Sequence, residues 1–135
     1  MYRLLVPLDN SMDRAKKQAA YVSNLPCADD SVEVVLAHTI TGEERSVPEE
    51  MQRADRVETV RRTMEILEDA DIEVDSRDLS SPPSEGILTL AESEEFDEIV
   101  MGGRKRSPTE KAILGSVTQT VILNAEIPVT VTGGQ

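Results

Sequence analysis

The sequence has few aromatic residues, a single cysteine and no long hydrophobic run. It contains no Trp, one Phe and two Tyr in 135 residues, which leaves little stacking surface for single-stranded nucleic acid. Cys27 has no second cysteine for an internal disulfide, and we expect it to be a small, partly buried filler. No segment approaches the roughly 18 apolar residues of a membrane-spanning helix, and the N-terminus lacks a secretory signal pattern. We therefore expect a cytoplasmic protein.

Positive charge is also scarce. The 26 acidic residues outnumber the 14 basic ones and give a formal net charge of −12, which repels nucleic acid and anionic lipid. We expect neither a nucleic-acid partner nor a membrane partner. Acids spread over the whole chain, with only four lysines against ten arginines, are typical of halophilic proteins; the alternative is an ordinary acidic cytosolic protein. In multimolar salt the Debye length falls to about 3 Å or less, so the excess charge would cause little self-repulsion.

Short apolar segments alternate with amphipathic ones along the chain. The segment 4–8 is continuously apolar, as in a strand that is buried on both faces. Further strands are expected at 32–40, 72–75, 98–101 and 127–131. Between them, apolar residues at steps of three or four predict helices over about 11–25, after Ser46, from about 81 and from Ser116. Ser46 and Ser116 each open a Ser-x-x-Glu/Gln capping box.

The order βαβαβαβαβ predicts one α/β domain over residues 1–135. Strands that are separated by helices run parallel with right-handed crossovers, which gives an open five-stranded parallel sheet with helices on both faces. Ligands of such sheets bind beyond the carboxyl ends of the strands. Asp9 follows the first predicted strand, Thr39 ends the second and Gly102 follows the fourth. We therefore expect these three residues at the binding edge.

The loop after the fourth predicted strand indicates a phosphate site. Glycine at 102 and 103 lets the backbone approach a ligand closely, and Gly115-Ser116 opens a helix whose N–H groups attract an anion. Each of these residues also has a simpler explanation. Asp9 can be a turn residue or helix cap, the glycine pair can permit a tight exit from the strand, and Gly115-Ser116 can be only a capped helix start.

Five segments carry a family resemblance: LLVPLDNS, LAHTI, IVMGG, LGSVTQTVI and IPVTV. With these segments the chain resembles the universal stress protein family over essentially its whole length. The resemblance implies an adenine nucleotide alpha-hydrolase-like, Rossmann-like fold and a homodimer that pairs through the last strand, Ile127 to Thr132. It also implies the following contacts: Asp9 with the ribose or adenine, the backbone near Thr39 with the base, and Gly102, Gly115, Ser116 and Val117 with the ribose and phosphates.

In nucleotide-binding members of this family the fourth strand is followed by G-x-x-G-x9-G-[ST]. This chain reads G-x-x-K-x9-G-S, with Lys105 in place of the second glycine. A side chain there can obstruct the backbone or disfavour a positive φ angle, at a cost of about 1 kcal/mol or more. Alternatively, Lys105 forms charge-assisted bonds to phosphate together with Arg104 and Arg106. A solvated basic loop is the ordinary interpretation of such a triplet.

Two functions remain open at this point. The resemblance implies a stress-response or signalling module that binds an adenine nucleotide, namely ATP with or without Mg²⁺. The substitution at Lys105 motivates the alternative, a non-nucleotide-binding member that acts as a dimeric protein-interaction scaffold. We expect no catalysis beyond slow ATP hydrolysis by water, because the sequence supplies no convincing catalytic residue and no set of metal ligands. His38 is the only histidine, and we expect it to be structural.

Overall fold

The computed structural model describes residues 1–9, 11–38, 58–80, 82–103 and 115–133. Five strands form one sheet in the order β3-β2-β1-β4-β5, and all neighbouring strands are parallel. The open five-stranded α/β fold that the sequence predicts is therefore confirmed. The strands are β1 (Tyr2–Leu8), β2 (Val32–His38), β3 (Glu73–Asp78), β4 (Glu98–Met101) and β5 (Val129–Val131).

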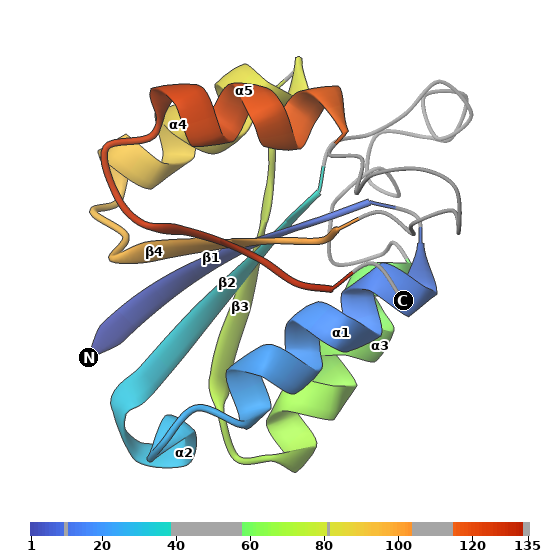
Figure 1. Ribbon diagram of the computed structural model, residues 1–135. Coiled ribbons are helices and arrows are strands. Elements are labelled where there is room, and N and C mark those ends of the chain that lie inside the picture. Colours follow the sequence, from blue (N-terminus) through green and yellow to red (C-terminus); the bar gives the residue numbers. More distant parts are fainter. Residues whose placement is uncertain (10, 39–57, 81, 104–114, 134–135) are drawn as a thin grey trace.

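Helices cover both faces of this sheet. Helices α1 and α3 pack side by side on one face, and α4 and α5 pack together on the other (Figure 1). Of the described segments, none forms a helix with the length and apolarity that a bilayer crossing requires. The helices are α1 (Met12–Ser23), α2 (Ala28–Ser31), α3 (Glu58–Asp69), α4 (Pro83–Ser93) and α5 (Ser116–Asn124).

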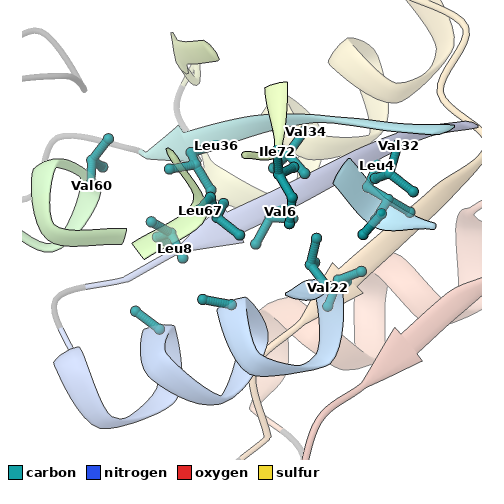
Figure 2. Packing of buried hydrophobic residues seen from close by; sticks show 14 residues of the cluster. Leu4, Val6, Leu8, Val22, Val32, Val34, Leu36, Val60, Leu67 and Ile72 are labelled. Atoms are coloured by element: carbon teal, nitrogen blue, oxygen red, sulfur yellow. The ribbon is translucent and has the colours of Figure 1, made fainter. Parts of the chain in front are cut away.

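The core has two halves, one on each face of the sheet. In β1, Leu4, Val6 and Leu8 point toward α1 and α3, where they meet Val22 and Leu67 (Figure 2). Leu5 of the same strand points to the other face and joins a cluster beneath α4 and α5. The central strands are therefore buried on both sides, which is why their sequences are continuously apolar rather than alternating.

Some predicted element boundaries were wrong. Strand β3 continues to Asp78, beyond the predicted end at 75, because backbone pairing with β2 holds its polar residues in the ladder. Strand β5 begins at Val129 rather than at 127, since Pro128 has no N–H to donate. Cys27 is exposed and adopts a left-handed backbone with φ 58° between α1 and α2, so the prediction of a partly buried filler was wrong. The predicted start of the helix after Ser46 lies outside the described residues.

Candidate functional site

The direction in which the chain crosses the sheet reverses between β1 and β4. From β1 the chain passes through α1 to β2 on one side, and from β4 it passes through α5 to β5 on the other. The ladder that joins β1 and β4 ends at the pair Leu5 and Ile99, although β1 continues to Leu8 and β4 to Met101. Ligands of open α/β sheets bind at this point of reversal, beyond the carboxyl ends of the strands. We call the ends of β1 and β4 and the residues that follow them the switch point.

The side chain of Gln18 joins the two strands where their ladder has ended. Its Nε2 atom donates to the backbone oxygen of Pro7 at 2.7 Å and to that of Val100 at 3.0 Å. The side chain is 1% exposed. Because Pro7 has no N–H to offer β4, this amide replaces the missing ladder bonds. Gln18 was not predicted from the sequence. Its one signal is a polar residue within the buried stripe of α1, between Ala15 and Val22.

Asp9 lies directly beyond β1 and shapes the entry into α1. Its Oδ1 atom accepts from the backbone N–H of Ser11, the N-cap of α1, at 2.8 Å. Its Oδ2 atom accepts from Nε of Arg14 at 2.8 Å and lies 2.8 Å from Nη2 of the same guanidinium. The Asp9 side chain is 54% exposed, and a carboxylate can accept about four hydrogen bonds. Asp9 therefore acts as a turn residue and keeps acceptor capacity for a ligand; the predicted contact with a nucleotide stays a prediction.

The two glycines after β4 have packing reasons of their own. A Cβ atom on Gly102 would lie 3.1 Å from Oε1 of Gln18 and 3.2 Å from Cβ of Arg14. A Cβ atom on Gly103 would overlap the carbonyl oxygen of Thr132. None of the described glycines has a positive φ, so close approach rather than backbone conformation explains the glycines here, as a tight fit at Gly102 and an outright overlap at Gly103. The tight exit from the strand that the sequence suggested is therefore present.

Helix α5 begins at the same end of the sheet (Figure 1). Gly115 is its N-cap, with an extended backbone at φ −66° and ψ 160°, and Ser116 is its first helical residue. The prediction that Ser116 is the cap of a capping box was therefore wrong by one residue. Because Gly115 has no side chain, it cannot cap the first N–H groups of the helix. Ser116 is exposed, and Val117 is half-buried against the core beneath α4 and α5.

Two predicted site residues, Thr39 and Lys105, lie outside the described residues. His38, which precedes Thr39, is the last residue of β2 and is 1% exposed. Its backbone oxygen accepts from the N–H of Leu79 at 3.0 Å. Asp9 and Gly102 both lie near Arg14, whose guanidinium binds Asp9 and whose stem stands 3.2 Å from the place that a Cβ on Gly102 would occupy.

Among the described residues, the switch point presents the carboxylate of Asp9, the guanidinium of Arg14 and the N-terminus of α5. Within the described ranges, no group of three or more His, Cys, Asp or Glu side chains is arranged to hold a metal ion.

A buried carboxylate lies away from this site, where β4 begins. Glu98 is 6% exposed and accepts from the hydroxyls of Tyr2 at 2.9 Å, Tyr21 at 2.9 Å and Thr130 at 2.6 Å. Burial and the bond to Glu98 raise the pKa of Tyr2 to about 12. For Tyr21, the hydrogen bond with Thr130 lowers the pKa, but burial and Glu98 outweigh it, so the pKa is raised. The cluster ties β1, α1, β4 and β5 together, and we assign it a structural role.

This fold and this edge define a doubly wound α/β protein of the kind that binds ligands at its switch point. The model of the universal stress protein family matches residues 1–133. The chain belongs to that family, as the resemblance predicted.

Solved structures share the whole fold. A universal stress protein from Archaeoglobus fulgidus is 29% identical, with a TM-score of 0.78 and coverage of 98% of both chains. Another structure of the universal stress protein from Archaeoglobus fulgidus, in complex with dAMP, is 24% identical, with a TM-score of 0.73 and the same coverage of both chains, 98%. Because the dAMP complex is only 24% identical, its similarity to this chain concerns the fold alone.

A curated relative gives the same family. It is a universal stress protein of Methanocaldococcus jannaschii, 30% identical over 82 residues, which are 61% of this chain. The match spans 48% of that relative, or about half its length.

Proposed function

We propose that the protein binds an adenine nucleotide at the switch point and acts as a ligand-responsive module in a stress response or in signalling. The observation that carries the proposal is the convergence of Asp9, Gly102 and the start of α5 at one end of the sheet. A carboxylate beyond β1 can accept from ribose hydroxyls or from the adenine amino group. The first N–H groups of α5 can bind phosphate. The relative that was solved with dAMP shares this fold, which supports an adenine nucleotide as the ligand class.

ATP, with or without Mg²⁺, is the nucleotide that we propose to test first. The backbone of Gly115, Ser116 and Val117 would hold its phosphates, and Mg²⁺ would be carried largely by phosphate oxygens and water. Lys105 would add a charge-assisted bond from the loop, and the backbone near Thr39 would meet the base. Because such nucleotides are abundant in the cytoplasm, the proposal includes a cytoplasmic location.

The proposed role is binding rather than catalysis. A general base must lie within hydrogen-bond reach of the proton that it removes. Among the described residues, the acid at the switch point is Asp9, and its oxygens already accept from Ser11 and Arg14, which supports a positioning role. We therefore expect ATP hydrolysis to be slow, with water as the nucleophile.

A second function is favoured by the packing of the two glycines. Gly102 lies against Gln18 and Arg14, and Gly103 against Thr132, so neither glycine needs a nucleotide to account for it. If Lys105 blocks the loop, the same fold would serve as a dimeric scaffold for protein contacts.

Thermal unfolding with and without nucleotide separates the two functions. The experiment compares ATP, ADP and AMP, each with and without Mg²⁺, in concentrated KCl. A ligand at about 100 times its Kd stabilises the folded state by roughly 2.7 kcal/mol, which corresponds to a rise in Tm of roughly 5–15 °C for a domain of this size. Asp9→Ala should reduce the rise, whereas Asp13→Ala removes the same charge from an exposed position on α1 and should not.

The scaffold function predicts a different result. In that case no nucleotide raises Tm, and the purified protein releases no nucleotide when it is denatured and extracted. A stoichiometric nucleotide in the extract would eliminate the scaffold as the sole function.

We also propose that the protein is a homodimer that pairs through β5. This strand is at the edge of the sheet. Pro128 accepts from β4 and Thr132 donates to it, so the alternate residues Val129 and Val131 direct their N–H and C=O groups away from β4. Unpaired backbone groups along an edge favour pairing with another strand, and a second copy of β5 across a two-fold axis satisfies them.

A further inference from the structure

We infer that Arg14 contacts the phosphate group attached to the ribose of the bound nucleotide, so that the site selects nucleotides over nucleosides. This inference rests on the proposed function. It names the chemical group that the site recognises and adds a residue that the family motif does not include.

Arg14 spans the two strand ends of the switch point. It lies in the first turn of α1, and its Cβ and Cδ atoms are 3.2 Å and 3.4 Å from the place where a Cβ of Gly102 would stand. At its other end, the guanidinium is bound to Asp9. The side chain therefore runs from the residue that follows β4 to the residue that follows β1. A ligand that contacts both Asp9 and Gly102 would then lie beside Arg14.

The guanidinium is fixed in place and keeps donors for a ligand. Its described hydrogen bond and ion pair use Nε and Nη2, both toward Oδ2 of Asp9. Its side chain is 31% exposed. Five N–H groups in a planar fork match phosphate oxygens well, and the bond to Asp9 has already restricted the side chain, so little further order is needed on binding.

Charge gives a second reason for this role. The chain carries a net charge of −12, and a nucleotide adds further negative charge to the complex. A cation at the point of contact offsets this repulsion, and a charge-assisted bond to phosphate is stronger than a neutral one. Asp9 would then bind the sugar or base through its remaining acceptor capacity, and the phosphate would lie at the edge of the guanidinium that Asp9 does not use.

A purely structural role for Arg14 makes a different prediction. If the guanidinium only holds Asp9 in place, its removal weakens the binding of adenosine and of AMP by the same factor. Both ligands carry the ribose and the base that Asp9 would contact. If the guanidinium binds phosphate, its removal weakens AMP and leaves adenosine unchanged.

Isothermal titration of the full chain with adenosine and with AMP tests the inference. Arg14→Met keeps an aliphatic stem over Gly102 and removes the charge, so we expect AMP to bind roughly 10- to 100-fold more weakly, as for other hydrogen bonds to charged groups. Adenosine should bind as it does to the unchanged protein. Lys16→Met is the matched control, since it removes the same charge from α1 but lies in the groove against Arg61 and Glu65 of α3. It should change neither affinity by more than about twofold, as is usual for surface substitutions.

Arg14→Gln provides a second variant without the charge, and it should likewise weaken AMP binding and leave adenosine binding unchanged. It keeps the test decisive if Arg14→Met does not fold. Equal losses for adenosine and AMP in the Arg14 variants, or no loss in either, would overturn the phosphate contact. If the unchanged protein binds neither ligand nor ATP, the proposed function itself fails, and this result is distinct from a change in preference.

Discussion

A Cβ atom at position 103 would overlap the carbonyl oxygen of Thr132, the residue after β5. The N–H of Thr132 donates to the backbone oxygen of Met101 at 3.0 Å, so the backbone of Thr132 is fixed against the end of β4. The chain leaves β4 through Gly102 and Gly103, directly beside this hydrogen bond. The absence of a side chain at Gly103 therefore sets how closely the edge strand approaches the switch point.

Gly103→Ala should destabilise the protein by about 1–3 kcal/mol, as other overpacked substitutions do. The added methyl group forces the backbone of residue 132 away from Met101 and weakens the last hydrogen bond of β5. Urea unfolding measures the change. Gly133→Ala is the control, because a Cβ on Gly133 meets nothing within 4 Å. Equal effects of the two substitutions would contradict the overlap.

The fold could be predicted because burial on both faces of a sheet leaves a direct mark on the sequence. The segment 4–8 is apolar at every position, and Leu4 and Leu5 fill opposite halves of the core. The predicted boundaries of the edge strands were less accurate. The polar residues of β3 pair through their backbone up to Asp78, and backbone pairing has no signature in side-chain type.

The site was predicted only in part, because its details depend on contacts between distant segments. Gly102 and Gly103 were predicted to let the backbone approach a ligand or to permit a tight exit from the strand. The groups that lie against them, from Gln18 and Thr132, are known only from the fold. Gln18 and Val100, its partner in β4, are 82 positions apart in the sequence. No local pattern predicts that β1 and β4 separate there and need an amide between them.

Gln18→Met should lower the free energy of unfolding by about 2–4 kcal/mol. The substitution keeps the volume of the side chain but leaves the buried oxygens of Pro7 and Val100 without the amide donor that they now share, and each unsatisfied buried group costs about 1–3 kcal/mol. Urea unfolding should give this loss, and hydrogen exchange should be faster at the ends of β1 and β4. The free energy of unfolding of Lys16→Met, a substitution on the same helix, should lie within about 0.5 kcal/mol of that of the unchanged protein. A neutral result for Gln18→Met would show that water satisfies both oxygens.

The dimer can be tested by removing one outward backbone donor. Val129 directs its N–H away from β4, whereas Thr130 directs its N–H toward β4 and occupies the register position opposite Val100. Val129→Pro should therefore leave the monomer folded, since proline is tolerated on an edge whose N–H faces outward, and should shift sedimentation from dimer to monomer. Thr130→Pro should instead destabilise the sheet itself. If Val129→Pro remains a dimer, the subunits pair through another surface.

Tyrosine ionisation reports on the Glu98 cluster. The pKa of Tyr2 is raised from 10.0 to about 12, and that of Tyr21 is raised as well. A raised pKa means that the fold favours the protonated hydroxyl, so this stabilisation is complete below pH 10.0 and is lost as the pH rises toward about 12. The ultraviolet absorbance of tyrosinate should develop well above the pH found for the urea-unfolded chain. Glu98→Gln removes the negative charge and should lower both pKa values. If the tyrosines of the native protein ionise at the same pH as those of the unfolded chain, the hydrogen bonds to Glu98 do not raise their pKa values.

The acidic surface predicts a dependence of stability on molar salt. The last turn of α3 holds Glu68 and Asp69 and no basic residue, although negative charge near a helix C-terminus is unfavourable. If the protein is adapted to high salt, its Tm should continue to rise in KCl above about 1 M, where the Debye length is already about 3 Å. The double substitution Glu68→Gln, Asp69→Asn should raise Tm at low salt and reduce the slope of Tm against KCl concentration. A Tm that stops rising below about 1 M would instead be ordinary charge screening, as expected of an acidic protein without such adaptation.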